Sequence, residues 1–301
     1  MKSTVAGASA RDREAKRSEA IAPGWTTATV DSLISAVRLT HDRDLSRLDE
    51  AFLARSLERR LEATATASPE TYIERLAKDP PEADALLQSL DIHHSELFRD
   101  PLACALLEQR ILPGLALQKE AQSGTEIRVW SAGCAGGHEA YSVAILLSEL
   151  SDARERSVPF RIIATDSSQA QLDLAREGAY AEAAMQNVRL GHLERWFTRS
   201  GQTYTARPEL RARVDFSAYD LLDGRSTSPP ASIFGEFDLV LCCNLLYYYR
   251  PDAQKLILDK LRGCLSSNGV LVTGDTEREA VLGLGGFRAV ASSAAVFQKG
   301  R

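Results

Sequence analysis

Two polar features in the middle of the chain have the residue types that bind a nucleoside. The run Trp130–Gly137 reads W-S-A-G-C-A-G-G and lies between an expected strand and an expected helix. Its glycines, Gly133 among them, allow a sharp turn and a close approach of the backbone to a ligand. Asp166 ends the next expected strand, where its carboxylate could accept hydrogen bonds from both hydroxyls of a ribose. The alternative is that Asp166 caps the following helix, before Ser167 and Ser168.

The glycine-rich run is weak evidence when it is taken alone, because many strand-to-helix connections contain glycine. It also lacks the G-x-G-x-x-G spacing of dinucleotide-binding proteins, which argues against that class of ligand. Its position at the carboxyl end of a strand is where open parallel sheets bind their ligands.

Strands and helices alternate along the chain after residue 124. Short apolar runs predict strands at 127–130, 160–166, 237–243, 270–273, 287–290 and 294–298, with helices at about 139–150, 169–177 and 251–265. This alternation predicts an α/β fold with a mostly parallel sheet covered by helices on both faces. Residues 178–218 interrupt the rhythm, and we expect them to form a small β subdomain, a flap that includes strands at 203–205 and 213–216.

The first part of the chain has a different pattern. Leucines and other apolar residues recur at three- and four-residue intervals over residues 30–117, which predicts a small all-helical domain. Ser68 and Pro69 suit the cap and first position of one of its helices. Residues 1–29 are polar and basic without an apolar block, and we expect a flexible tail rather than a secretory signal. The remainder, 118–301, forms the second domain.

Composition restricts the class of protein further. A net charge of −5 gives no basic excess for a nucleic acid partner, and no apolar run approaches the length needed to insert into a membrane. The five cysteines are an odd number without C-x-x-C spacing, and the histidines also lack metal-ligand spacing, so we expect neither disulfides nor a metal site. A reducing compartment, the cytoplasm, follows. Nothing requires more than a monomer.

Five motifs, in order along the chain, resemble one known family. The run Trp130–Ser142 is similar to the cofactor loop W-S-A-G-C-S-T-G-E-E-P-Y-S of the chemoreceptor glutamate methyltransferases, the CheR family. Residues 95–100 (S-E-L-F-R-D), 163–166 (I-A-T-D), 238–249 (D-L-V-L-C-C-N-L-L-Y-Y-Y) and 274–277 (G-D-T-E) resemble further family motifs. The similarity spans about residues 30–299. Five ordered motifs are far more specific than one glycine loop.

The resemblance implies a Rossmann-like class I methyltransferase sheet, S-adenosylmethionine as cofactor and protein-glutamate O-methyltransferase activity. It implies that Arg99 lies beside the cofactor and the acceptor carboxylate, and that Tyr248 lines the methyl-transfer pocket. The cofactor-contact positions of the family correspond here to His93, Ser95, Arg99, Gly133, Glu139, Asp166, Asp220, Leu221, Cys243 and Asn244. For Arg99 the alternative is a surface ion pair with Asp100 or Glu96, and for Tyr248 a place in a packed aromatic cluster.

The chain departs from the family at several of these positions. His93 and Asp220 stand where asparagine is usual, His138 replaces a glutamate, and Gly136 replaces a threonine. Cys243 replaces an arginine, which removes a fixed positive charge and five hydrogen-bond donors. Two alternatives therefore stay open: a cofactor-binding regulatory protein with impaired catalysis, and a methyltransferase for another acceptor.

The resemblance also implies a partner, a chemoreceptor or receptor-like protein that accepts the methyl group. In the family a basic helix meets the acidic receptor, and here Arg55, Arg59 and Arg60 fall on the matching helix among acidic neighbours. A solvated face of mixed charge is an equally good interpretation. A glutamate acceptor, with a reference pKa of about 4.3, is already ionised and needs no general base.

Overall fold

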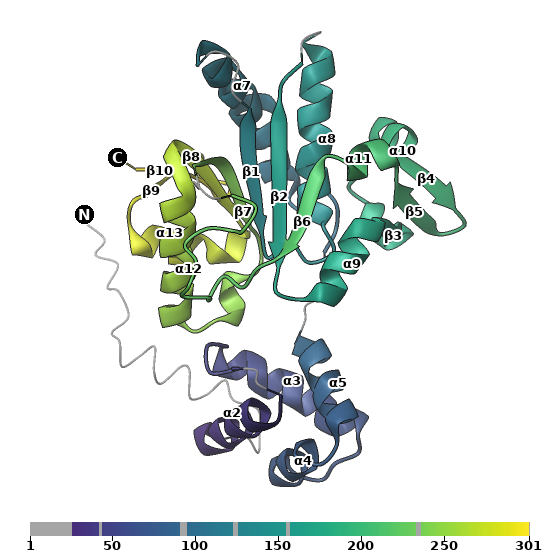
Figure 1. Cartoon of the computed structure of the whole chain (residues 1–301), viewed down its shortest axis with the longest axis vertical. Helices are drawn as coiled ribbons and strands as arrows, with labels where there is room; N and C mark the ends of the chain where they lie inside the picture. Colours follow the sequence, from purple (N-terminus) through teal and green to yellow (C-terminus); the bar gives the residue numbers. More distant parts are fainter. Residues whose placement is uncertain are drawn as a thin grey trace, which may run out of the picture. The chain divides into compact units, whose positions relative to one another are not determined.

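The computed structural model describes residues 26–41, 44–90, 95–122, 126–154, 157–232 and 236–300 (Figure 1). The chain divides into two compact units. The helical unit contains Met1–Ile92 together with Tyr248–Ala253, and the sheet unit contains His93–Tyr247 and Gln254–Arg301. Most of the expected N-terminal tail lies outside the described residues. The sequence-based domain boundary at residue 117 differs from this division at Ile92.

In the described residues, the helical unit has four helices around one apolar core. They are α2 (Thr27–His41), α3 (Glu50–Ala63), α4 (Pro69–Leu76) and α5 (Pro80–Leu90). The Ser68 hydroxyl accepts a hydrogen bond from the Thr71 amide and Pro69 takes the first turn of α4, as the sequence predicts. The recurring leucines of the sequence, such as Leu33, Leu53 and Leu57, are fully buried in the core.

One carboxylate in this core is satisfied by two partners. Glu82 accepts hydrogen bonds from Arg60 Nε at 3.0 Å and Nη2 at 2.7 Å, and from the Tyr72 hydroxyl at 2.6 Å. Burial raises the pKa of Glu82, but the hydrogen bonds from Arg60 and Tyr72 outweigh burial and hold the pKa below its usual value. This network joins α3, α4 and α5 where their apolar faces meet.

The sheet unit contains a seven-stranded sheet of order β6-β2-β1-β7-β8-β10-β9. All pairings among the first five of these strands are parallel, whereas β10 is antiparallel to β8 and β9. The strands are β1 (Ile127–Ala132), β2 (Phe160–Asp166), β6 (Val214–Ala218), β7 (Phe237–Cys242), β8 (Leu265–Thr273), β9 (Phe287–Ala289) and β10 (Val296–Lys299). The central strands are mostly buried because helices cover both faces.

Helices lie on both sides of this sheet (Figure 1). From β1 the sheet continues to one side through β2 and β6, and from β7 it continues to the other side through β8. Right-handed crossovers therefore place α8 and α9 on one face and α12 on the opposite face. The helices are α6 (Pro101–Leu106), α7 (Leu112–Ala121), α8 (His138–Ala153), α9 (Gln169–Glu177), α12 (Pro251–Cys264) and α13 (Arg278–Leu284), with a π-helical turn η1 (Leu107–Ile111) between α6 and α7. The predicted Rossmann-like fold class is confirmed.

A second, three-stranded antiparallel sheet of order β3-β5-β4 is inserted between β2 and β6. We use "flap" for residues 179–213, which contain β3 (Ala179–Ala181), η2 (Glu182–Met185), α10 (Leu190–Trp196), β4 (Phe197–Ser200), β5 (Thr203–Ala206) and α11 (Pro208–Arg211). The sequence placed Arg213–Phe216 in this insertion. In the structure Val214–Ala218 is instead β6, the edge strand that pairs with β2 through Ile162 and Val214.

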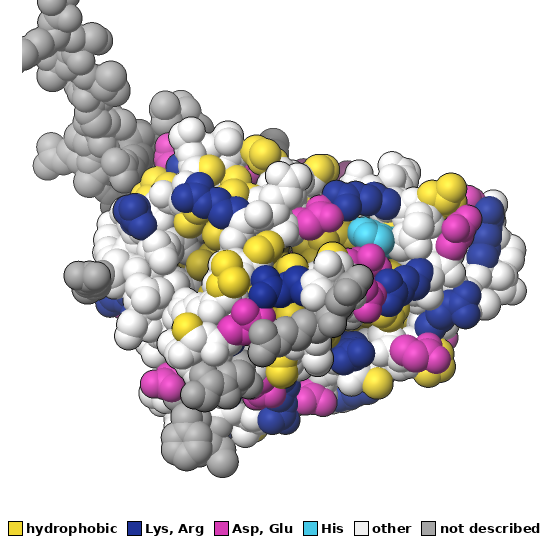
Figure 2. Space-filling model, turned by 90° about the horizontal axis from the view of Figure 1, so that it is seen from above, with side chains coloured by type: hydrophobic (Ala, Val, Ile, Leu, Met, Phe, Trp, Pro, Cys, Tyr) yellow, Lys and Arg dark blue, Asp and Glu magenta, His cyan; other side chains and the backbone are white. Residues whose placement is uncertain are grey.

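In the view of Figure 2 basic and acidic side chains are interspersed.

The network around Glu82 yields a stability prediction. A Glu82→Gln change should lower the free energy of unfolding by about 2–3 kcal/mol, because two donors lose a charged acceptor in a buried site. Urea denaturation followed by circular dichroism measures this, with Glu74→Gln on the exposed face of α4 as the control. The difference should shrink as the pH falls through the lowered pKa of Glu82, since protonation removes the same charge. A loss equal to that of the control would contradict the assignment.

Candidate active site

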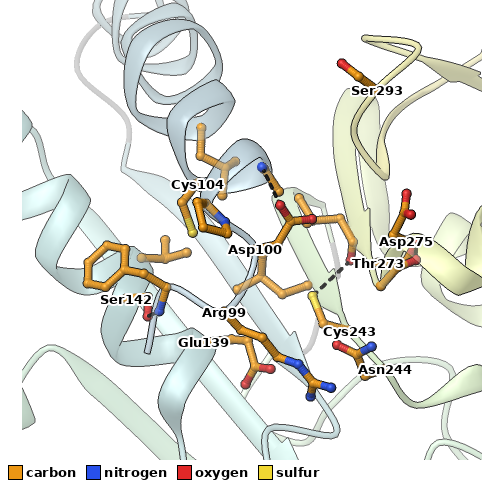
Figure 3. A pocket seen from close by; sticks show the side chains of 18 residues that line it. Arg99, Asp100, Cys104, Glu139, Ser142, Cys243, Asn244, Thr273, Asp275 and Ser293 are labelled. Atoms are coloured by element: carbon orange, nitrogen blue, oxygen red, sulfur yellow. Dashed lines mark hydrogen bonds between the residues drawn. The ribbon is translucent and has the colours of Figure 1, made fainter. Parts of the chain in front are cut away.

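A cavity of about 390 Å³ opens in the sheet unit at the carboxyl ends of β7 and β8 (Figure 3). Four chain segments and Ser293 form its wall. They are the turn into α6 and η1, the first turns of α8, the end of β7 and the end of β8. Its lining residues include Phe98, Arg99, Asp100, Cys104, Leu107, Glu139, Ser142, Leu241, Cys243, Asn244, Thr273, Gly274 and Asp275. Four sequence-predicted site residues, Arg99, Glu139, Cys243 and Asn244, are therefore brought together.

The cavity has more acidic than basic side chains. Asp100, Glu139 and Asp275 contribute carboxylates, and Arg99 is the one basic side chain among the described lining residues. Asp100 also caps α6 by accepting hydrogen bonds from two amides of its first turn. Figure 3 shows the Arg99 and Glu139 side chains extending into the same region of the cavity. Such a lining attracts a cationic ligand and still offers one fixed cation to a carboxylate.

Glu139 has an unusual protonation equilibrium. Burial raises its pKa to about 7, although its own backbone amide and the charge of Arg99 oppose the shift and Glu277 adds to it. A carboxyl group with this pKa is half protonated near neutral pH and gains most from a ligand cation that favours its ionised form. Its position in the first turn of α8 follows from the glycine-rich run that precedes it.

A left-handed residue directs the chain into the cavity wall. Phe98 has φ of +54°, a conformation that non-glycine residues seldom adopt. Its amide donates to Ser142 Oγ at 3.0 Å, and the Ser142 hydroxyl donates to the His138 carbonyl at 2.7 Å. Arg99 follows directly, so α8 fixes the turn that presents the guanidinium to the cavity.

Glu277 organises the opposite wall and was not assigned a role from the sequence. Its carboxylate accepts hydrogen bonds from the amides of Asn244 at 3.0 Å, Leu246 at 2.6 Å and Gly274 at 2.7 Å. Asn244 is left-handed, with φ of +57°, and a Cβ atom at Gly274 would approach Asn244 Nδ2 to 2.6 Å. The only sequence signal was the match of residues 274–277 to a family motif.

The glycine-rich turn and Asp166 lie together at the carboxyl ends of β1 and β2. The Gly133 amide donates to the Thr165 carbonyl at 2.8 Å, and the turn requires φ of +70° at Gly133. One carboxylate oxygen of Asp166 accepts from the Ala135 amide and the other from the Ser168 amide, both at 2.9 Å. Ser168 is the residue that caps α9, so Asp166 holds the glycine turn instead.

Asp220 and Leu221 belong to the same edge of the sheet. The Tyr219 amide donates to the Asp166 carbonyl at 2.9 Å, which places the following residues beside the end of β2. Asp220 is exposed and accepts from the Leu222 amide at 2.8 Å, whereas Leu221 is buried. Gly133, Asp166, Asp220 and Leu221 do not line the 390 Å³ cavity.

Ser95 and Tyr248 are not among the described residues that line the cavity. His93 lies outside the described residues. Ser95 is half-buried and is absent from the cavity lining. Tyr248 is also absent from it and belongs to the helical unit, where its carbonyl accepts from the Asp49 amide at 2.8 Å and its ring lies 4.8 Å from that of Phe52.

The departures His138 and Cys243 have different environments. The His138 ring lies 4.6 Å from that of Tyr180 outside the cavity, and burial lowers its pKa to about 4, so it is neutral at pH 7. Cys243 lines the cavity, and burial raises the pKa of its thiol well above the usual value. Within the described part of the chain, no group of three or more potential ligands is placed to hold a metal ion. No described helix is long and apolar enough to span a membrane.

Glu277 gives the second prediction. Glu277→Gln should lower the free energy of unfolding by about 1.5–3 kcal/mol, because an amide nitrogen cannot accept the hydrogen bonds that one carboxylate oxygen accepts now. Thermal and urea denaturation measure the effect. Glu279→Gln, at an exposed position two residues away, is the matched control and should be neutral. Equal stability of the two variants would show that the turn does not depend on Glu277.

Comparison with known proteins gives one family. The model of the CheR methyltransferase SAM-binding domain matches residues 93–282. Chemotaxis protein methyltransferase 1 of Pseudomonas aeruginosa is 31% identical, over 64% of this chain and 69% of its own. The putative methyltransferase Cher3 of Pseudomonas putida is 32% identical over 81% and 86%. An uncharacterized 104.1 kDa protein of Rhodobacter capsulatus is 34% identical over 74% of this chain, but the match spans only 22% of that protein. The chain belongs to the CheR family of S-adenosylmethionine-binding methyltransferases.

Proposed function

We propose that this protein transfers the methyl group of S-adenosylmethionine to glutamate side chains of a chemoreceptor or a related signalling protein, acting as a monomer in the cytoplasm. The observation that supports this acceptor is the guanidinium of Arg99, the one basic side chain beside three carboxyl groups among the described residues that line the cavity. A carboxylate entering such a cavity is attracted at one point and repelled elsewhere, which orients it.

The residues present fit the cofactor. Burial favours the neutral acid form of Glu139, and a bound cation favours its ionised form. Glu139 therefore suits the ammonium group of the amino acid moiety of the cofactor. Asp166, at the end of β2 and fixed by two amides, suits the ribose hydroxyls. In this proposal Gly133, Leu221, Asn244 and the other predicted contact positions complete the site from the same edge of the sheet.

The proposed mechanism requires alignment rather than proton transfer. When bound, S-adenosylmethionine would supply a methyl group on a positively charged sulfur, which an acceptor oxygen would displace as a neutral thioether. Arg99 orients the acceptor carboxylate without taking a proton, and Tyr248 is proposed to line its path. Opposite charges disappear in this step, so apolar side chains such as Leu107, Leu241 and Val272, which keep water out, favour it.

One observation favours a second candidate, a cofactor-binding regulator without turnover. Cys243 lines the cavity as a neutral thiol, so the site has less positive charge for an acceptor carboxylate than a site with arginine at this position. A methyltransferase for a neutral acceptor is consistent with the same feature.

Methyl transfer from tritiated S-adenosylmethionine separates these candidates. The acceptors are recombinant cytoplasmic fragments of chemoreceptors from the source organism, with matched fragments in which candidate glutamates are replaced by alanine. Label that is released as methanol in mild base, and is absent from the matched fragments, supports the proposal. Base-stable label indicates another acceptor, and binding of S-adenosylhomocysteine without any label indicates the regulator. Arg99→Ala should lower turnover by about 100-fold through misalignment.

The raised pKa of Glu139 predicts proton-linked binding. A carboxyl group that is protonated in the free protein must lose its proton to hold an ammonium group, so affinity for S-adenosylhomocysteine should fall as the pH drops below about 7, by up to tenfold per pH unit. Calorimetric titration at pH 6.5 in two buffers of different ionisation enthalpy measures the proton release.

The control for this experiment is a variant without the titrating group. Glu139→Gln should bind more weakly and release no proton, whereas Glu279→Gln should behave as the unaltered protein. Proton release that persists in Glu139→Gln would assign the linkage to another group.

A further inference from the structure

The flap is joined to the segment that forms the cavity wall. Hydrogen bonds between three pairs of residues connect residues 184–189 of the flap to residues 96–108. They are the Leu97 amide to the Ala184 carbonyl at 3.1 Å, Asn187 to Glu96 at 3.3 Å, and two bonds of 2.6 Å from Arg189 to Glu108. The two segments therefore depend on each other for their positions.

An aromatic stack lies at the centre of this connection. The imidazole of His192, on α10, stacks on the ring of Phe98 with centroids 5.5 Å apart and an interplanar angle of 26°. Both residues are only 8% exposed. Helix α10 is itself fixed to α8, since Glu149 accepts from Trp196 Nε1 at 3.0 Å and from Arg195 at 3.2 Å. The His192 ring is thus held on a supported element and not on a free loop.

Phe98 needs such support because its backbone is strained. A left-handed phenylalanine persists only where its surroundings fix it. Ser142 of α8 holds the amide, as described above, and His192 of the flap holds the ring. Removal of either would let the turn relax and would displace the next residue, Arg99, which lines the cavity.

We propose that His192 is a positioning residue: its stack on Phe98 fixes the left-handed turn that places Arg99 in the cavity. The flap thereby determines the geometry of the cofactor site as well as forming its own small sheet. This inference rests on the proposed function only where it assigns Arg99 a role in binding, because the stack itself can be tested without any ligand.

Two substitutions separate the ring from the rest of the side chain. His192→Leu keeps an apolar side chain of similar size but has no aromatic face, whereas His192→Phe keeps the stack. The Phe variant also removes Nδ1 of the imidazole, which is buried without a hydrogen-bond partner among the described residues. Neither change should unfold the flap, so the comparison does not depend on a truncated side chain.

Hydrogen exchange measured by mass spectrometry tests the stack directly. In His192→Leu the amides of residues 96–103 should exchange about 3- to 10-fold faster, the range expected for loss of an aromatic pair. His192→Phe should restore protection. Arg199→Ala, which removes a flap ion pair with Glu182, should leave it unchanged. Unaltered exchange in His192→Leu, or equal loss in both variants, would overturn the proposal.

Calorimetry with S-adenosylhomocysteine tests the consequence for the cavity. His192→Leu should weaken binding about 3- to 10-fold, but in an Arg99→Ala background it should weaken binding less than about twofold, because the group that it positions is absent. Additive effects would refute positioning through Arg99. If Arg99→Ala binds normally, the binding role of Arg99 fails. Absence of methyl transfer to receptor fragments would instead count against the proposed acceptor and leave the exchange result unaffected.

Discussion

The parallel pairing of β1 with β7 is the constraint on which the rest of the sheet unit depends. Trp130 pairs with Val240 and Ser131 with Leu241 at the point where the strand order reverses. The chain leaves β1 toward β2 and leaves β7 toward β8, so the loops after these strands diverge and leave space between them. The cavity lies on the β7 side of this divide, where the ends of β7 and β8 and the first turns of α8 line it.

An edge of this kind leaves backbone amides in need of acceptors, and carboxylates supply them. Asp166 accepts two amides on the β1–β2 side, and Glu277 accepts three on the β7–β8 side. At Glu277 burial raises the pKa, and the hydrogen bonds from the backbone amides oppose that rise. Glu139 has fewer partners of this kind, and its pKa is accordingly raised to about 7. Glu139 is therefore the carboxylate that the protein's own donors stabilise least, and it is the one available to a ligand.

The sequence was sufficient for the fold class, the glycine turn and the family, because these depend on local periodicity and on ordered motifs. It was insufficient where a contact joins distant segments. The edge strand β6 was assigned to the flap because a short strand does not reveal its partner. Tyr248 lies in a run that resembles a family motif, and its contacts with Asp49 and Phe52 of the helical unit had no signal in the sequence. No periodic pattern in the sequence indicated the π-helical turn before Pro113. The physical cause of this turn is the proline, because it lacks a backbone N–H donor and crowds the preceding turn.

The replacement of an arginine by Cys243 changes the charge that the cavity presents to an acceptor. An arginine there would neutralise part of the acidic lining and provide a second fixed cation, whereas the thiol has no charge and bonds weakly to the Val272 carbonyl at 3.7 Å. In the proposed function, the orientation of the carboxylate acceptor then depends more strongly on Arg99. We propose that the place of Arg99 follows from Phe98, which Ser142 and His192 contact. A site with one cation tolerates less displacement than a site with two, since no second charge holds the acceptor when the first one moves. In this proposal, rigid support of the turn around Phe98 makes a single arginine adequate.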